Sequence, residues 1–291
     1  MTLFDLLKKA YISLGHMEIS TATGGSVSTI IDTKLGDKYG DGDIIGSSVF
    51  IIRDGGGNNA APEQEVSRIT DYVQSTNTIT VSPSFSASVE ASDTYGVAKP
   101  IIELDTMIEL TNLALQGLGT IQLTDTSLTT LDDVTEYSLP VGMKYRISLV
   151  QMATNNDPND SQYNDVSGWY QINSGPGSVG MLVFNNELPS GYTLKLFYEA
   201  EHPRVQNMTD KVAEVLHSEY ASRLVVDKVL EYQVRRTNGT DPFLLQTANK
   251  AMQDVMEARS RFSQPKHKRP KYLTPYKFDI NEVEEDNGYQ G

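Results

Sequence analysis

Apolar residues recur at steps of three and four in two short stretches, and each stretch ends at a glycine. The first runs from Leu3 to Leu14 and is followed by Gly15, and the second runs from Glu103 to Leu118 and is followed by Gly119. This spacing puts the apolar side chains on one face of an α-helix, and glycine often follows a helix end. The pattern predicts two amphipathic helices.

After each helix, the helical period gives way to short runs of Val, Ile, Thr and Tyr separated by turn residues. Runs at this spacing are typical of strands in a small antiparallel barrel or sandwich. Between Met17 and Pro100 the expected strands are Val27–Asp32, Ser48–Arg53, Ser67–Val73, Thr78–Val81 and Thr94–Lys99. Between Thr120 and His202 they are Thr135–Ser138, Tyr145–Met152, Gly168–Ile172, Gly180–Phe184 and Thr193–Tyr198.

Helical periodicity returns in two later stretches. The first is expected to run from Thr209 to Arg236, capped by its first residue or by Asp210. The second should begin at Pro242, because Asp241 followed by a proline is a strong start signal, and should end near Phe262. Its buried face is expected to consist of Leu244, Ala248, Ala251, Met252, Val255 and Met256.

Three prolines among basic residues follow, at positions 265, 270 and 275, and they favour an extended arm over a helix. The sequence thus predicts an α+β protein, in which a helical framework carries two antiparallel β barrel-like or sandwich-like insertions and ends in the arm. The expected segments are a helix at 1–16, a β-rich insertion at 17–100, a helix at 101–118, a second β domain at 119–203, a helical hairpin at 204–262 and the arm at 263–291.

Composition limits where such a chain can work. The 291 residues are 38% hydrophobic, and no apolar run approaches the roughly 20 residues that span a bilayer. The first residues show neither the apolar run nor the cleavage site of a signal peptide. The absence of cysteine excludes disulfides and thiolate metal sites. These features fit synthesis in the cytosol, and equally a particle that passes between reducing and oxidising surroundings.

The net charge of −14 is unevenly distributed. Residues 259–278 hold seven Lys or Arg and no acid, residues 279–291 hold five acids and no base, and the first 258 residues have a net charge of −16. An acidic body argues against adhesive binding to nucleic acid, which requires phosphate neutralisation. The best-placed partner of the basic segment is another acidic protein surface.

No motif in the sequence indicates catalysis, so we expect neither an enzyme nor a cofactor nor a metal. The histidines, at 16, 202, 217 and 267, lack the spacing of a metal site or a triad. The acids at 32, 37, 41 and 43 lack the register of a calcium loop and are interpreted as a turn. The glycine run from Arg53 to Pro62 lacks the lysine of a phosphate-binding loop. Trp169 and Tyr170 are expected to be core residues of a strand.

The basic arm allows three interpretations: a nucleic-acid or nuclear-localisation patch, a solvated tail, or a segment that docks on an acidic partner. The third is favoured because aromatic and aliphatic residues are interleaved with the charges, and an arm that orders on binding needs buried anchors. The proposed docking residues are Lys266, Lys268, Arg269, Lys271, Tyr272, Leu273, Tyr276 and Phe278.

The run from Arg68 to Tyr95, R-I-T-D-Y-V through T-I-T-V-S-P-S-F to A-S-D-T-Y, resembles a β module of tailed-bacteriophage virion proteins. Much of the remaining chain resembles the head–tail connector (adaptor, or neck) proteins of such phages. The residues that carry this resemblance are Ser13-Leu14-Gly15, Ser138-Leu139-Pro140 before the strand at 145–152, Glu187-Leu188-Pro189-Ser190-Gly191 before the strand at 194–198, and the paired helices at 209–262 with Ala221, Ser222, Arg223 and Leu224.

The resemblance implies a structural protein of the virion neck, made in the host cytoplasm. Its copies would form a ring, usually twelve-fold, beneath the portal, with the arm reaching into the portal, a tail or neck protein below, and double-stranded DNA passing through without specific binding. The insertion at 17–100 departs from the smallest family members, which are mainly helical. Apolar residues on more than one helix face suggest a subunit interface made of Leu216, Tyr220, Val225, Val226, Val229 and Leu230.

Two other classes remain open at this point. A capsid decoration, tail-tube or tail-completion protein would account for the β module equally well but makes less use of the arm. A carbohydrate-binding module would use Trp169, Tyr170 and Tyr192 as a sugar platform and would act as a monomer.

Overall fold

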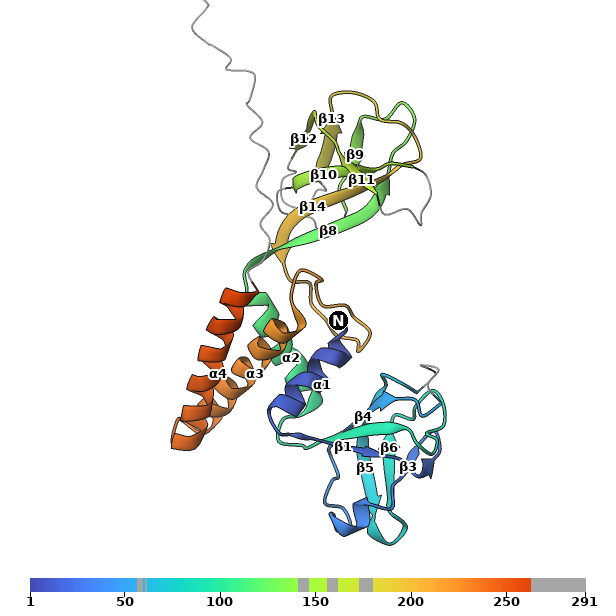
Figure 1. Cartoon of the computed structure of the whole chain (residues 1–291), viewed down its shortest axis with the longest axis vertical. Coiled ribbons are helices and arrows are strands. Elements are labelled where there is room, and N and C mark those ends of the chain that lie inside the picture. Colours follow the sequence, from blue (N-terminus) through green and yellow to red (C-terminus); the bar gives the residue numbers. More distant parts are fainter. Residues whose placement is uncertain (57–59, 61, 141–146, 156–161, 173–179, 263–291) are drawn as a thin grey trace, which may run out of the picture. The chain divides into compact units, whose positions relative to one another are not determined.

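The computed structural model describes residues 1–56, 60, 62–140, 147–155, 162–172 and 180–262 (Figure 1). Four α-helices and three antiparallel sheets lie within these residues, which confirms the predicted α+β class. None of these sheets closes into a barrel over the described ranges, so the barrel form of the prediction is replaced by open sheets. The expected arm at 263–291 lies outside the described residues. The helices are α1 (Leu3–Ser13), α2 (Leu104–Gln116), α3 (Ser218–Arg236) and α4 (Pro242–Arg261).

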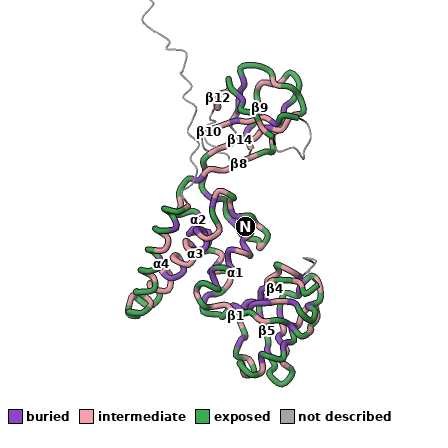
Figure 2. The backbone as a smooth tube through the Cα atoms, viewed as in Figure 1, coloured by how far each residue is buried: buried purple, intermediate pink, exposed green. Residues whose placement is uncertain are grey.

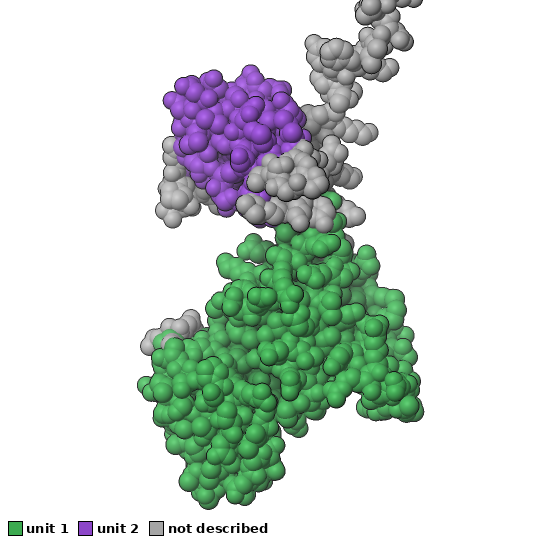
Figure 3. All heavy atoms as spheres, turned by 180° about the vertical axis from the view of Figure 1, so that it is seen from behind, with its two compact units in different colours: residues 1–123, 199–265 green, residues 124–198, 266–291 purple. Residues whose placement is uncertain are grey.

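Contacts divide the described chain into two compact units (Figure 3). Unit 1 holds residues 1–123 and the described residues from 199 onward, and therefore all four helices. Unit 2 holds the described residues between 124 and 198. The chain enters unit 2 along β8 (Thr120–Thr129) and leaves it along β14 (Thr193–Glu201), which are neighbours in one sheet.

Helix α1 begins and ends where the sequence predicts. The Thr2 hydroxyl accepts a hydrogen bond from the backbone N–H of Asp5 at 3.3 Å, and Leu14 closes the last turn on the carbonyl of Ala10. Gly15 follows with a φ of 69°, a left-handed conformation that glycine adopts without steric cost. The apolar face of α1 is buried.

Unit 1 also contains a seven-stranded antiparallel sheet in the order β1-β7-β4-β5-β6-β3-β2. Its strands are β1 (Met17–Thr21), β2 (Gly24–Gly25), β3 (Thr29–Ile31), β4 (Ser48–Arg53), β5 (Val66–Val73), β6 (Thr78–Ser82) and β7 (Thr94–Ala98). Two short 3₁₀ turns, Leu35–Asp37 and Gln74–Thr76, lie in its connections.

Strand β4 is buried on both faces, which accounts for its continuous apolar run. Phe50 faces the helices, and its ring lies 5.6 Å from that of Phe4 and 5.7 Å from that of Tyr11. Val49 and Ile51 point to the other face, into a separate core within the sheet region. Because successive side chains of a strand alternate between faces, this one strand joins the helical core to the β core.

Helix α3 begins nine residues later than the sequence predicts. Residues 207–210 instead form a turn beside the start of the chain, and Lys211 makes an isolated antiparallel bridge with Thr2. Leu3 N–H donates to the Asp210 carbonyl, and Phe4 N–H donates to the Met208 carbonyl. These bonds satisfy backbone donors in the first turn of α1, which have no partner within the helix. Val212 is buried by this packing against the start of the chain, so its apolar character does not reflect helical periodicity.

Unit 2 contains two open sheets, in the orders β11-β10-β14-β8 and β12-β13-β9. One core draws buried residues from both sheets, such as Leu182 and Phe184 from one and Val150 and Leu196 from the other. Besides β8 and β14, the strands are β9 (Glu136–Ser138), β10 (Ile147–Ala153), β11 (Tyr163–Asp165), β12 (Trp169–Ile172) and β13 (Met181–Phe184).

Candidate interaction surface

Asp32 and Asp41, two of the four acids interpreted as a turn, hold loops in place. Asp32 is fully buried and accepts hydrogen bonds from the Ser20 hydroxyl at 2.5 Å and the Tyr95 hydroxyl at 2.8 Å. Asp41 accepts from the backbone N–H of Gln74 at 2.6 Å. No cluster of three or more histidine or acidic side chains in the described ranges is arranged to hold a metal ion.

The Asp32 cluster is a stabilising network in the β region of unit 1. Burial, reinforced by the hydrogen bond to Asp32, raises the pKa of Tyr95 far above its ordinary value, so the phenol stays protonated and donates. Nearby, burial and then the hydrogen bond to Glu18 raise the pKa of Tyr39 to about 12. These contacts are structural, because a phenol whose pKa is raised in this way keeps its proton near neutral pH and serves as a hydrogen-bond donor.

His202 has a structural role as well. Burial lowers the pKa of His202, so the ring is neutral, and Ala213 N–H donates to its Nε2 at 3.0 Å. The other nitrogen, Nδ1, therefore carries the proton and donates to the Pro203 carbonyl at 2.6 Å. The ring fastens the segment that leads into α3.

Trp169 and Tyr170 do not form one platform. They are adjacent residues of β12, and successive side chains of a strand point to opposite faces. Trp169 packs against the core of unit 2, while Tyr170 is 51% exposed. The expectation of a core residue is therefore confirmed for Trp169 and wrong for Tyr170. This arrangement separates two of the three aromatic residues that the sugar-binding alternative requires, the third being Tyr192.

The residues predicted as a subunit interface belong to the core of unit 1. Leu216, Tyr220, Val225, Val229 and Leu230 are buried within the chain itself, and Val226 is half-buried against the same core. These five side chains are at most 6% exposed and offer almost no surface to a second copy, so this expectation is corrected for them. Their apolar positions surround α3 because α1, α2 and α4 all pack against it.

Helices α3 and α4 form a hairpin with well-defined ends. Thr237 starts the turn, and Asn238 and Gly239 then adopt left-handed conformations with φ of 50° and 67°. The Asp241 carboxylate accepts from the backbone N–H groups of Phe243 at 2.9 Å and of Leu244 at 3.1 Å, which confirms the predicted helix start.

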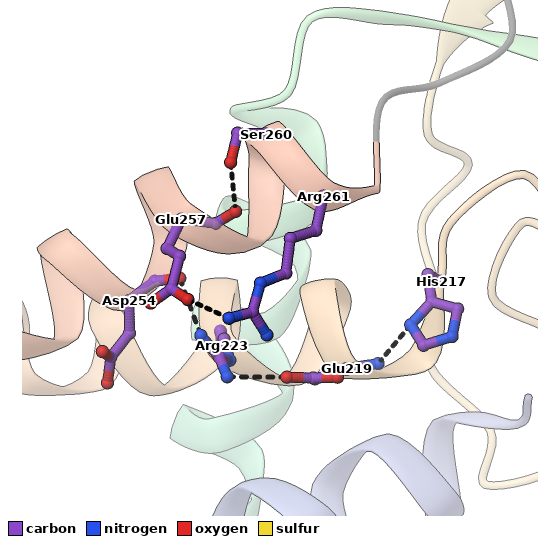
Figure 4. A network of polar contacts seen from close by, with 7 residues as sticks. All are labelled: His217, Glu219, Arg223, Asp254, Glu257, Ser260 and Arg261. Carbon is purple, nitrogen blue, oxygen red and sulfur yellow. Dashed lines mark hydrogen bonds and ion pairs between the residues drawn. The ribbon is translucent and has the colours of Figure 1, made fainter.

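A polar network crosses between the two helices (Figure 4). Arg223 of α3 donates to the backbone carbonyl of Asp254 on α4 at 3.0 Å and to the Glu219 carboxylate at 2.6 Å. Arg261 is paired with Glu257 along α4. The bond to the Asp254 carbonyl joins the two helices, and the pair with Glu219 lies within α3 and holds the guanidinium in place. Because Arg223 is only partly exposed, this charge-assisted bond ties the helices together more effectively than an exposed surface pair would.

The open end of the hairpin is held by a ring stack. The His217 and Phe262 rings are parallel to within 5°, with centroids 3.9 Å apart. His217 caps α3, since its Nδ1 accepts from the backbone N–H of Glu219 at 3.3 Å. The chain therefore leaves α4 from a fixed point, immediately before residue 263, where the basic arm begins. The arm's docking residues, from Lys266 to Phe278, lie outside the described residues.

Helix α4 is largely exposed, in contrast to the expectation for its apolar residues (Figure 2). Its buried residues are Ala251 and Ala258, and Leu244, Ala248 and Val255 are half-buried. Met252 and Met256, predicted to be buried, are 50% and 57% exposed. The missed signal is the width of the apolar arc, because a helix with apolar residues on more than one side has more apolar surface than one neighbour can cover.

No protein-family model matches the chain, and no curated protein matches its sequence at a significant level. None of the helices in the described ranges combines the length and the apolar content of a membrane span.

Proposed function

We propose that the protein is a structural component of a tailed-phage virion, a head–tail connector (adaptor) that forms a ring under the portal, bridges capsid and tail and lets DNA pass. The arm at 263–291 would dock in the portal, and α4 would belong to the outer surface from which neighbours are contacted. The chain would act without a catalytic residue or cofactor.

The observation that carries this proposal is the construction of the hairpin. A helix pair tied by Arg223 and closed by the His217–Phe262 stack holds the described chain in place up to Phe262. The segment that follows combines strong positive charge with apolar anchors such as Tyr272 and Phe278. A firm support with a basic, aromatic extension favours an arm that reaches into another protein.

The remaining polar groups support a structural role. The buried Asp32 and His202 hold loops and strand connections, because Asp32 accepts from the Tyr95 hydroxyl and His202 Nε2 accepts from the Ala213 N–H. The net charge of −16 on the first 258 residues suits a conduit, because an acidic wall repels passing phosphates.

Native mass spectrometry tests the proposal. The full chain of 32.1 kDa should assemble into multiples of its own mass with a candidate portal protein, and removal of residues 263–291 should abolish portal binding. Replacing Lys266, Lys268, Arg269 and Lys271 by Glu should weaken portal binding about tenfold to a hundredfold, since exposed ion pairs contribute roughly 0.2–1 kcal/mol each and reversal adds repulsion.

The matched control replaces four exposed bases in the described chain, Lys34, Lys99, Lys211 and Arg236, by Glu. This control changes the net charge by the same amount but should leave portal binding nearly unchanged. If both variants bound the portal equally weakly, the loss of binding would come from the change in net charge and not from the arm. A chain that stays monomeric and ignores the portal would contradict the connector proposal.

A further inference from the structure

The exposed side of α4 carries a continuous stripe with few charges. Leu245, Asn249, Met252, Met256 and Arg259 follow one another at steps of four, three, four and three, so they share one side of the helix, and all five are exposed. The acids of α4, Asp254 and Glu257, fall on other sides. Methionine, with arginine and without acids, is the composition found at the centres of protein interfaces.

Helix α2 presents a stripe of the opposite character. Asp105, Glu109, Leu113 and Gln116 occur at steps of four, four and three on its exposed side. Leu113 is 53% exposed, and α2 contains no Lys or Arg. Glu109 is already paired with Arg204, which leaves Asp105 as the acid best placed for a new partner.

We propose that the α4 stripe of one copy packs antiparallel against the α2 stripe of a second copy, with Met252 on Leu113 and Arg259 beside Asp105. The two stripes run over similar numbers of residues. When Met252 lies on Leu113, the seven-residue step from Met252 to Arg259 spans nearly the same length of helix as the eight-residue step from Leu113 back to Asp105. In the parallel orientation Arg259 would pass beyond the end of α2, away from both acids.

The occupant of the α4 stripe is a second copy because the complementary surface is present on the same chain. Helices α2 and α4 are different elements that each pack on α3, so one copy offers both halves of the contact. Two different patches that fit each other make a head-to-tail interface, which closes into a ring or grows into a filament. That this interface closes into a ring rests on the proposed function, and the α4–α2 contact would be the one that joins neighbouring copies in that ring.

A charge exchange tests the contact directly. In the full chain, Arg259→Asp and Asp105→Arg should each weaken self-association about tenfold or more, because each places like charges opposite one another. The double variant should restore association. The matched control is Phe243→Ser, which removes a 79% exposed ring from another side of the same helix and should change nothing. Sedimentation velocity measures association, and circular dichroism confirms that each variant is folded.

The absence of cysteine in the chain allows a second readout. A mixture of Met252→Cys and Leu113→Cys chains should form a disulfide between the two variants, which requires Cα atoms within about 7 Å. Met252→Cys alone should not link to itself. Efficient self-linking of Met252→Cys would indicate a symmetric contact and would overturn the proposal.

Both measurements are made with and without the candidate portal, so that the two proposals can fail separately. Association that survives the single charge reversals, or a portal-bound assembly without the 252–113 disulfide, overturns the α4–α2 contact and leaves the connector function standing. If the copies associate through the α4 stripe but do not bind the portal, the α4–α2 contact is supported and the connector function is contradicted. A chain that is monomeric in both conditions overturns the contact.

Discussion

Helices α3 and α4 have similar lengths and similar apolar content, yet they occupy very different environments. Helix α3 is surrounded by α1, α2 and α4, and its apolar residues on several sides are buried. Helix α4 packs on α3 and buries two alanines, with larger apolar side chains left in solvent. The comparison shows that a wide apolar arc gives the amount of apolar helix surface that could be buried. The number of helices of the same chain that pack against it decides how much of that surface is buried.

The largest effect that separates the two helices should come from the same substitution made in each. Val225→Asp in α3 places an unpaired carboxylate at a fully buried position and should cost about 4 kcal/mol or more of unfolding free energy. Met252→Asp in α4 should change the unfolding free energy by about 0.5 kcal/mol or less. Urea unfolding of dilute protein measures both values, and equal losses would refute the contrast.

A smaller effect should come from the bond that joins the helices. Arg223→Ala removes the contacts to the Asp254 carbonyl and to Glu219, and should cost about 1–2 kcal/mol. Arg261→Ala is the control, because it removes an exposed pair within α4 and should cost about 0.5 kcal/mol or less. If the two losses were the same in thermal or urea unfolding, Arg223 would be no more than a surface charge.

The smallest effect should be a dependence on pH in the segment that leads into α3. The unfolded His202 takes up a proton near its ordinary pKa of 6.5, whereas burial lowers the pKa in the folded protein. Just below pH 6.5 the unfolded state therefore binds more protons than the folded state. The stabilisation from the neutral, buried His202 is fully present above pH 6.5 and decreases as the pH falls below that value. His202→Gln should flatten the dependence of the unfolding free energy on pH between about pH 7 and 5.5, as measured by urea midpoints. Burial also lowers the pKa of His16, so His16→Gln measures the contribution of that second histidine separately. A slope unchanged by His202→Gln would contradict this assignment.

Local signals in the sequence were sufficient for most helix ends and many strands. Gly15 and the Asp241-Pro242 pair act within a few residues of themselves, so their effect does not depend on the rest of the fold. Strand β4 was predicted with its observed bounds, because its short apolar run between turn signals is typical of a buried strand and too short for a helix. Strand β8 was missed, since its Thr-rich sequence lies at a half-exposed sheet edge and lacks a clear apolar alternation.

The errors of prediction arose where a distant segment decides the outcome. The start of α3 was placed too early because residues 208–212 pair with the first residues of the chain, which are far away in the sequence. The interface residues of α3 were misassigned because burial by three other helices cannot be read from one helix alone. The exposed stripe of α4 was missed because its sequence shows a wide apolar arc but does not show how much of that arc the other helices cover.

The pairing between the first residues and 208–212 also has a consequence during synthesis. The first turn of α1 obtains backbone partners, and its apolar face obtains much of its cover, from segments made much later in translation. At translation rates of about 5–20 residues per second, the nascent α1 would wait for roughly 10–40 s before its native partners emerge. During that interval its apolar face is available to the ribosome surface or to chaperones. Because of the order of translation, α1 is therefore among the last elements of unit 1 to complete its native contacts.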